Sequence, residues 1–532
     1  MLQPVPSGAI VSTPEVNGAR SLLQTLVAAG VDVCFANPGT SEMHFVAALD
    51  TVPEMRAVLG LFEGVVTGAA DGYGRMTGRP AAVLLHLGPG LGNGLANLHN
   101  ARRAHTPIVV VVGDHATYHK RLDAPLESDI DALAGSVSGW VRRSWRSGDV
   151  GADAADAVAA ARTPPGRIAT LVLPADVSWG DGGRTMAPRV LPAARPVADT
   201  AVEEVVRALN SGEPTVILVG GDAVSDEAGL GAAGAVAAKT GARLICETFP
   251  ARLRRGSGLS RLGRLAYLGE MAAAQLAGAR HLVLIGAARP VSFFAYPGKP
   301  GDPVPEGCTV HSLALAGDDV RGVLTAVAAL VGVSVGGAPV EAAVRPPLPT
   351  GSLDADTIAA AVGALLPDDA IVVDEAITSG SGLGAALAGA PPHDLLTLTG
   401  GAIGFGLPSA TGAAVACPDR PVVCLQADGS AMYTISALWT QARESLDVTT
   451  IVYNNRSYAI LTSELDRVEA GAPGPVASGL LDLSRPDLDF VSLARGMGVP
   501  AARVTTADDL VRELRIAQRE PGPHLIDAVI AR

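Results

Sequence analysis

The chain has 532 residues, of which 48 % are apolar and 17 % charged, a balance typical of a globular protein with large buried cores rather than of a disordered one. The formal net charge is −13 and the chain has no basic face, so nucleic acid is not expected as a partner. No apolar stretch approaches the ~18 residues of a membrane span, so a membrane is not expected as a partner either. Five widely spaced cysteines match neither a disulfide framework nor a zinc site, and with no signal-peptide pattern they predict a cytoplasmic location.

Strand and helix signals alternate along the chain in three blocks separated by the Pro-rich linkers 190–200 and 340–352. The strand signals are the apolar runs at 81–87, 107–113, 168–174, 214–221, 242–248, 281–287, 370–375, 421–429, 448–455 and 524–530. Alternating strands and helices favour parallel sheets with right-handed crossovers. The sequence therefore predicts an α/β fold of three doubly wound parallel-sheet domains, at 1–190, 191–345 and 346–532. Periodicity alone does not show whether the outer two blocks are copies of one fold.

In the first block, several polar side chains are predicted at one edge of the sheet. Residues 35–40 end a strand with a tight turn, His86 follows the next strand, and His115 and His119 follow the one after it. Glu63 opens a helix of small residues, which lets that helix pack closely. A site at such an edge is typical of doubly wound sheets. Taken singly, the acid also fits ordinary helix-dipole chemistry and the histidines also fit structural roles.

The third block holds the most specific pattern, a diphosphate and metal site. Asp428 follows one apolar strand, and Asn455, 27 positions later, follows the next. Gly429 and Ser430 are predicted to open a helix whose N–H groups suit a phosphate. Oxygens of Asp428, of Asn455 and of a carbonyl near Ser457 suit Mg²⁺, with a diphosphate and water completing its shell. The alternative interpretation is a pair of ordinary turns.

Three neighbouring segments extend this pattern. Residues 374–380 follow a strand and carry hydroxyls that suit a phosphate, and the glycines of 400–406 allow a cofactor to approach the backbone closely. Residues 431–446 are predicted to form one helix after the metal loop.

Together these strings resemble the thiamine-diphosphate (ThDP) dependent family of 2-oxo acid decarboxylases and carboligases, which includes acetolactate synthase, pyruvate oxidase and benzoylformate decarboxylase. The resemblance spans nearly the whole chain and rests on NPG-x-x-E from Asn37, ADGY from Ala70, G-x-GN ending at Asn93, GFGLP from Gly404, DGS from Asp428 and SALWT from Ser436. It implies a pyrimidine-binding first domain, a central domain and a diphosphate-binding third domain. It also implies a homodimer or homotetramer with active sites between the first domain of one chain and the third of another, and a small 2-oxo acid substrate.

The resemblance also implies roles for single residues. Glu63 aligns with the glutamate that favours the imino tautomer of the aminopyrimidine, whose nitrogen removes the thiazolium C2 proton before CO₂ leaves. Ile403 aligns with the apolar residue that props the cofactor into its bent shape. Thr40 and His86 align with polar residues that position the substrate carboxylate and move protons. The remaining cofactor positions are Asn37, Pro38, Gly39, Thr378, Ser379, Gly401, Asp428, Gly429, Ser430, Asn455, Ser457, Tyr458 and Ala459.

The chain departs from the family pattern at two places. The family usually has Gly where this chain has Ala427, and a positive φ there would cost about 1 kcal/mol. Benzoylformate decarboxylase carries a catalytic histidine in the segment that matches 289–296, where this chain has Phe293 and Phe294. A phenyl ring cannot deliver a proton. The two phenylalanines are either part of the core or, with His115, part of the substrate pocket.

These features favour a ThDP- and Mg²⁺-dependent carboligase that passes the decarboxylated unit to a second carbonyl, as acetolactate synthase does. A benzoylformate-type decarboxylase that releases an aldehyde is a close alternative, and a catalytically silent ThDP-binding homologue is another. The central block holds no decisive FAD signature, so FAD is not favoured. No G-x-G-x-x-G motif opens a helix after the first strand, which disfavours a nicotinamide dehydrogenase.

Overall fold

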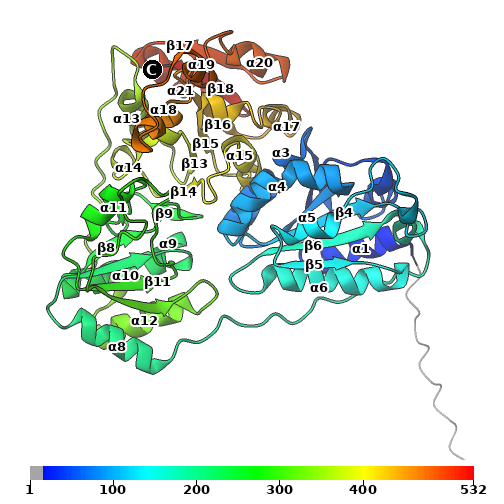
Figure 1. Cartoon of the computed structure of the whole chain (residues 1–532), viewed down its shortest axis with the longest axis horizontal. Coiled ribbons are helices and arrows are strands. Elements are labelled where there is room, and N and C mark those ends of the chain that lie inside the picture. The colour runs from blue at the N-terminus through cyan, green and yellow to red at the C-terminus, as the bar shows by residue number, and fades with distance from the viewer. Residues whose placement is uncertain (1–15, 532) are drawn as a thin grey trace, which may run out of the picture.

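The computed structural model describes residues 16–531 (Figure 1). The first sheet is parallel throughout, with strand order β2-β1-β3-β4-β6-β5. Its central strand β4 is buried at every residue because helices cover both faces. The strands are β1 (Val33–Ala36), β2 (Arg56–Leu59), β3 (Ala81–His86), β4 (Ile108–Asp114), β5 (Trp140–Arg143) and β6 (Ile168–Pro174). The helices are α1 (Gly18–Ala28), α2 (Met43–Leu49), α3 (Glu63–Thr77), α4 (Leu87–Arg103), α5 (Ile130–Gly135), α6 (Val150–Arg162) and α7 (Ala175–Trp179).

The central sheet has the order β10-β8-β7-β11-β12 and is also parallel. Its first strand lies in the middle, and the later strands add on either side. The strands are β7 (Thr215–Val219), β8 (Arg243–Cys246), β10 (Gly263–Arg264), β11 (His281–Ile285) and β12 (Thr309–Ala314). The helices are α8 (Asp199–Leu209), α9 (Asp222–Ser225), α10 (Glu227–Thr240), α11 (Gly269–Leu276) and α12 (Val320–Val331).

The third sheet has the order β17-β18-β16-β15-β13-β14-β9. All of its pairs are parallel except that of β9, which comes from the central segment and runs antiparallel to β14 at the edge. The strands are β9 (Leu253–Arg255), β13 (Ile371–Glu375), β14 (His393–Thr397), β15 (Val422–Ala427), β16 (Val448–Asn454), β17 (Ala501–Val504) and β18 (His524–Val529). The helices are α13 (Ala355–Leu365), α14 (Leu383–Ala386), α15 (Gly406–Ala416), α16 (Asp428–Ala431), α17 (Ala437–Arg443), α18 (Ala459–Arg467), α19 (Pro475–Leu481), α20 (Phe490–Gly496) and α21 (Ala507–Ala517).

The predicted fold class is therefore confirmed, and the outer two sheets share one topology. If β13 to β18 are counted from one to six, the third sheet has the order 2-1-3-4-6-5, which is the order of the first sheet. In both, the chain leaves the first strand in one direction and the third strand in the other. Ligands of open α/β sheets lie at this switch point, beyond the carboxyl ends of the strands. The fold thus predicts two equivalent places for a site, after β1 and β3 and after β13 and β15.

The first and third domains pack through α3 and α15, which lie side by side in Figure 1. A Cβ atom added at Gly72 would lie 2.1 Å from the Ser409 carbonyl oxygen, and one at Gly412 would lie 1.8 Å from that of Ala69. Only glycine at these positions lets the two helix backbones approach so closely. The prediction that small residues serve close packing of this helix is confirmed.

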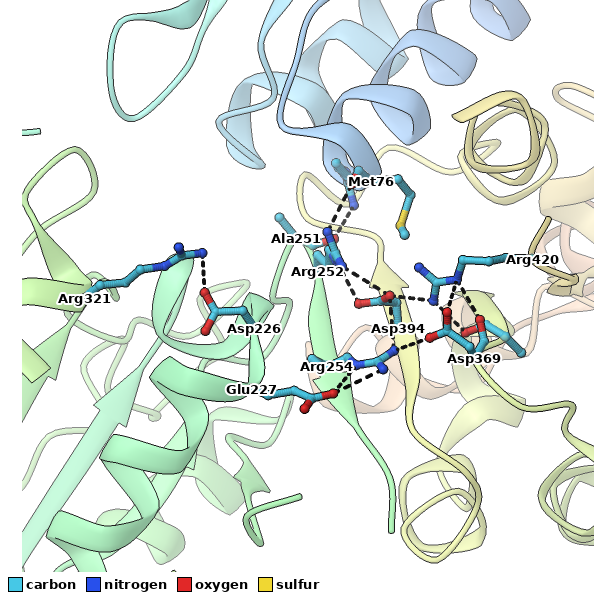
Figure 2. Close-up of polar contacts among 12 residues, drawn as sticks. Met76, Asp226, Glu227, Ala251, Arg252, Arg254, Arg321, Asp369, Asp394 and Arg420 are labelled. Carbon is cyan, nitrogen blue, oxygen red and sulfur yellow. Dashed lines mark hydrogen bonds and ion pairs between the residues drawn. The ribbon is translucent and has the colours of Figure 1, made fainter. Parts of the chain in front are cut away.

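Two arginines of the central segment and one of the third domain surround Asp394, a fully buried residue of β14 (Figure 2). Its carboxylate pairs with Arg252 at 2.7 Å and Arg420 at 2.7 Å, and Arg254 lies 3.6 Å away. Arg252 also donates to the carbonyl of Met76 in α3 at 3.1 Å. A buried carboxylate is tolerated only with such partners, so this cluster fixes the position of β9 between the outer domains.

The single helix predicted at 431–446 is wrong, because the chain forms α16, a turn and α17 instead. The turn lies where Thr434 donates its hydroxyl to the Gly404 carbonyl at 3.0 Å, and a Cβ at Gly404 would lie 2.7 Å from Tyr433 Cβ. Packing against the glycine loop therefore overrides the local helix preference.

The described residues contain neither a disulfide bond nor a helix that could span a membrane. The five cysteines are all free thiols there. Among residues 16–531, no helix is long and apolar enough to cross a membrane.

Candidate active site

The edge of the first sheet is built around one buried carboxylate. Glu42 ends the 3-10 turn η1 (Thr40–Glu42), and only 2 % of it is exposed. Its carboxylate accepts hydrogen bonds from the Gly39 N–H at 2.7 Å, from the Ser41 hydroxyl and from His86 Nδ1 at 2.9 Å. Because a carboxylate only accepts, this partner assigns the proton of a neutral His86 to Nδ1 and leaves the Nε2 lone pair available to a substrate.

The sequence predicted Thr40 and His86 at this edge but gave Glu42 no role. The signal was present in the NPG-x-x-E string, whose last residue is Glu42. Residues 37–38 lead from β1 into the turn, and Thr40 is exposed at its start. Gly39 allows the His86 ring to pack on the turn, since a Cβ there would lie 2.2 Å from the ring.

Glu63 lies at the same edge as the first residue of α3. Its carboxylate accepts a hydrogen bond from Asn93 Nδ2 at 3.0 Å, and Asn93 belongs to α4. A Cβ at Gly90 would lie 3.4 Å from Glu63 Oε1 and 3.5 Å from His86 Cβ. The structure thus brings the predicted acid and the predicted histidine close to one glycine. Asn93 is a partner of Glu63 that the sequence did not assign.

His115 follows β4 on the neighbouring strand. Its N–H donates to Asp114 Oδ1 at 2.7 Å, and its ring lies 5.6 Å from that of His119. Asp114 is fully buried in ion pairs with Lys120 and Arg143 and so has a structural role. His115 Nε2, by contrast, is buried without a hydrogen-bond partner among the described residues, which keeps His115 a candidate for the substrate pocket.

The matching edge of the third sheet brings Asp428 and Asn455 together. Asp428 begins α16 directly after β15, and Asn455 follows the neighbouring β16. Asp428 accepts from the Gly429 N–H at 2.7 Å and from the Arg456 N–H at 2.6 Å, while Asn455 Oδ1 accepts from the Ser457 N–H at 2.9 Å. The loops after β15 and β16 therefore lie side by side, although Asp428 and Asn455 are 27 positions apart in sequence.

This pair fits a hard cation. Asp428 is 2 % and Asn455 8 % exposed, and no ion pair of the described residues involves Asp428. Burial raises the pKa of Asp428, and backbone N–H groups only partly oppose this shift, so the carboxylate lacks a positive partner. No group of three or more His, Cys, Asp or Glu suited to a metal occurs at 16–531, which leaves amide, carbonyl and phosphate oxygens to complete a shell around this one carboxylate.

Ala427 does not strain the metal loop. Its φ of −71° and ψ of 147° are extended, a conformation open to any L-residue. The loss of stability that a positive φ at Ala427 would cause is therefore absent.

A second buried carboxylate shapes the glycine loop beside the metal residues. Glu375, at the end of β13, accepts from the Gly404 N–H at 2.7 Å and from the Gly406 N–H at 2.6 Å. Gln426 donates to the same carboxylate at 2.9 Å and to the Ser430 hydroxyl at 2.6 Å. Burial raises the pKa of Glu375, although these donors favour its charged form. No role was predicted for Glu375, yet its carboxylate holds the glycine loop that carries Ile403 just before α15.

The other predicted cofactor residues line this edge. Thr378 and Ser379 lie in the 3-10 turn η5 (Ile377–Gly380), where Thr378 is exposed and Ser379 half-buried. Ile403 is half-buried and packs on the main core of the outer domains. Hydroxyls and an apolar prop are therefore present where a diphosphate and a bent cofactor would need them.

The loop after β16 closes over the metal residues. A Cβ at Gly429 would lie 2.3 Å from the Tyr458 ring, so glycine is required there. The Tyr458 N–H and the Ser457 hydroxyl both donate to the Leu481 carbonyl, at 3.0 and 3.2 Å, and Ala459 opens α18. These contacts hold the Ser457 backbone beside Asp428 and Asn455.

Aromatic side chains of the central domain reach the same loop. The Phe293 ring covers Gly401, where a Cβ would lie 2.4 Å from its tip and where φ is +75°. Phe293 stands 5.0 Å from Phe294, 5.3 Å from Tyr267 and 5.9 Å from Phe249. Phe293 and Phe294 are 41 % and 53 % exposed, so they are not core residues. They form an apolar patch beside the cofactor loop.

Within one chain the two edges are linked through α4. Asn97 Nδ2 donates to the Gly64 carbonyl at 2.8 Å and to the Gly404 carbonyl at 3.1 Å, and Asn100 donates to the Ala402 carbonyl at 2.8 Å. Across the described part of the chain, no hydrogen bond joins the Glu63 side chain to the third domain. One chain therefore contains both edges, but among the described residues no hydrogen bond joins Glu63 at the first edge to Asp428 or Asn455 at the third.

Comparison with known proteins identifies these halves. Residues 16–134 match the model of the thiamine pyrophosphate enzyme N-terminal TPP binding domain, and residues 381–528 match that of the C-terminal TPP binding domain. "Putative acetolactate synthase large subunit IlvX" of Mycobacterium tuberculosis is 64 % identical over 97 % of this chain and 99 % of its own length. Benzoylformate decarboxylase of Pseudomonas aeruginosa is 31 % identical over 94 % and 96 %. The structure of a Rhodococcus jostii ThDP-dependent 4-hydroxybenzoylformate decarboxylase aligns with a TM-score of 0.83 at 27 % identity, covering 97 % of this chain and 99 % of that one.

Proposed function

The chain belongs to the thiamine pyrophosphate enzyme family, and from this premise we propose that it uses ThDP and Mg²⁺ to decarboxylate a 2-oxo acid and to pass the remaining unit to a second carbonyl compound. Bound ThDP would supply a carbanion that adds to the 2-oxo carbon and would accept electrons as CO₂ leaves. Asp428, Asn455 and the Ser457 carbonyl would hold the metal, and Ser430 and Thr378 the diphosphate. Glu63 would hold a proton on the pyrimidine, and His86 with Thr40 would orient the substrate carboxylate.

The observation that carries the carboligase outcome is the aromatic patch beside Gly401. Release of an aldehyde requires an acid that delivers a proton to the carbon from which CO₂ has left, and the Phe293 ring cannot do so. Burial, followed by neighbouring Tyr296 and Glu464, raises the pKa of Tyr267 to about 12, which makes Tyr267 a poor proton donor. A carbonyl acceptor that enters over this patch would therefore react before a proton arrives.

Benzoylformate-type decarboxylation is the second candidate. The flat aromatic rings around Phe293 also suit an aromatic 2-oxo acid, and two of the similar proteins are named as benzoylformate or 4-hydroxybenzoylformate decarboxylases. A silent homologue is disfavoured, because Glu63, Asp428 and Asn455 all keep the buried or hydrogen-bonded settings that the chemistry needs.

A product assay separates these functions. Purified protein is supplied with ThDP and Mg²⁺ and with pyruvate, 2-oxobutyrate or benzoylformate, and its products are identified. Acetolactate or another acyloin supports carboligation, whereas free aldehyde supports the second candidate. Phe293→His is expected to shift products toward aldehyde, with Phe294→His as the matched control. If ThDP neither changes turnover nor raises the unfolding temperature, the whole proposal fails.

We also propose that a second copy completes each site. Large apolar side chains stand exposed beside both halves in the single chain, and a partner would cover them: Met43, Leu61, Met432, Tyr433 and Leu461. If Glu63 and Asp428 of one site come from different chains, a mixture of the inactive variants Glu63→Gln and Asp428→Asn regains activity, because one site of each mixed dimer is intact. No recovery after subunit exchange would place both residues of a site in one chain.

A further inference from the structure

A separate cluster of titratable side chains lies in the central domain, at the amino ends of β11 and β12. His281 is the first residue of β11, and His311 is the third of β12. His281 pairs with Thr309 and His311 with Val283 in the parallel register, so the two histidines are diagonal neighbours on one face of the sheet. Their ring centroids are 5.2 Å apart, and His281 Nδ1 lies 3.1 Å from His311 Nε2.

The outer nitrogens of both rings face carboxylates. His281 Nε2 lies 2.9 Å from Glu213 Oε2, and His311 Nδ1 lies 3.1 Å from Glu204 Oε1. An ionised carboxylate only accepts, so each outer nitrogen carries a proton. In two neutral rings the inner nitrogens would then be bare lone pairs that face each other across 3.1 Å. The arrangement therefore needs either a proton or a metal ion between the two inner nitrogens.

We propose that a divalent transition-metal ion lies there, bound by His281 Nδ1 and His311 Nε2, with water at its remaining positions. Metal–imidazole bonds are about 2.0–2.1 Å long, so two nitrogens on one ion at angles of about 90–110° lie about 2.9–3.4 Å apart. The observed 3.1 Å falls within this range. A carboxylate on the second ring nitrogen is also the usual partner of a metal-binding histidine.

The two histidine side chains lie mostly below the surface, and their carboxylate partners are open to solvent. The side chains of His281 and His311 are 16 % and 7 % exposed, whereas Glu213 and Glu204 are 50 % and 61 % exposed. The two carboxylates offset the charge of a divalent ion. Arg280 lies 3.9 Å from the other oxygen of Glu213 and so faces the carboxylate. No third side chain of the described residues completes a metal cluster, which makes this a two-histidine site.

Cu²⁺ is the probe of choice, since imidazole sites bind it most strongly among the divalent first-row ions. Protein saturated with ThDP and Mg²⁺, which occupies the predicted metal site of the third domain, is titrated with Cu²⁺ and measured by electron paramagnetic resonance. We expect one site per chain whose spectrum shows coupling to two imidazole nitrogens. His281→Gln and His311→Gln should each remove the two-nitrogen signal, and Glu204→Gln should weaken Cu²⁺ binding about tenfold.

His119→Gln is the matched control, because its ring lies 5.6 Å from His115 in another half-buried pair. The proposal is overturned if the signal disappears in His119→Gln, or if it persists in both His281→Gln and His311→Gln. It is equally overturned if nitrogen NMR finds a shared proton between the rings that Cu²⁺ does not displace. The nitrogen coupling in the wild-type protein tests the proposal even if a variant fails to fold. Turnover with ThDP and Mg²⁺ is expected to be unchanged in His281→Gln, so this test is independent of the proposed reaction.

Discussion

The first and third sheets have one strand order and place their polar residues at the same switch point, yet their carboxylates have different hydrogen-bond partners. At the first edge, the carboxylates of Glu42 and Glu63 accept hydrogen bonds from the side chains of His86 and Asn93. We propose that these residues hold or move protons. At the third edge, Asp428 accepts hydrogen bonds from backbone N–H groups, and its charge would be available to the Mg²⁺ ion that we propose. The topology decides where a ligand lies, and the loops decide what is done to it.

The comparison predicts that a change at the first edge stops the reaction without loss of the cofactor. Glu63→Gln should lower kcat by about 10²–10⁴-fold, the range of general acid–base catalysis, because the neutral amide no longer favours a proton on the pyrimidine. ThDP affinity should stay near the wild-type value, since the glutamine oxygen still accepts from Asn93. Steady-state kinetics and ThDP titration measure the two quantities. Glu203→Gln on the surface of α8 is the control, and unaltered kcat in Glu63→Gln would contradict the assignment.

A change behind the histidine tests whether Glu42 acts through it. Gly39 N–H and His86 Nδ1 both donate to Glu42 Oε2, so a glutamine could keep both hydrogen bonds, whereas Glu42→Ala removes the acceptor that holds the proton of His86 on Nδ1. In Glu42→Ala we expect kcat to fall by about 10²-fold and nitrogen NMR to show the proton no longer held on Nδ1. Ser41→Ala, which keeps the carboxylate, should have a much smaller effect. A drop in kcat with an unchanged tautomer would leave Glu42 a merely structural residue.

At the third edge the expected loss is binding. ThDP with Mg²⁺ at a hundred times its Kd should stabilise the wild-type protein by about 2.7 kcal/mol. Asp428→Asn should lose most of this gain, because the only carboxylate of the metal site is gone. Urea unfolding with and without the cofactors measures the difference. Full cofactor stabilisation of Asp428→Asn would show that the two edges do not divide the work as described.

The central sheet adds a third case, a half-buried acid, Glu247, for which no cation is predicted. Burial raises the pKa of Glu247 to about 7, with a weak opposing hydrogen bond from Gly221. Between the ordinary pKa and 7, the folded state holds a proton that the unfolded state has lost, so Glu247 lowers stability as pH rises through this window. Glu247→Gln should therefore be more stable than wild type by about 1–3 kcal/mol at pH 8 and equal to it near pH 4.5. Equal stability at both pH values would contradict the shift.

The smallest effect is expected at the family departure. Ala427→Gly should cost about 0.5–1 kcal/mol of stability, because glycine loses more backbone freedom on folding. ThDP affinity should not change, since Ala427 is already extended. A clear gain in ThDP affinity would show that the methyl group strains the metal loop after all.

The sequence by itself determined most of what lies along one strand or one turn. Its apolar runs coincide with most of the buried inner strands of the three sheets, although β14 was missed. Asp428, Asn455, Glu63 and His86 stand at strand ends or at the start of a helix, and the family resemblance assigned their roles. Short edge strands such as β2, β5 and β17 were missed, because a run of four half-exposed residues carries little periodic signal.

Only the tertiary structure decided which distant residues meet. Glu42 and Glu375 became recognisable once their carboxylates were seen to orient His86 and the glycine loop. His281 and His311 lie 30 positions apart, and strand register alone brings their rings together. The predicted helix is interrupted at Thr434 because its hydroxyl donates a hydrogen bond to the Gly404 carbonyl of another loop. Local patterns report backbone preference and burial, whereas long-range hydrogen bonds depend on how the sheets are ordered, which no local pattern encodes.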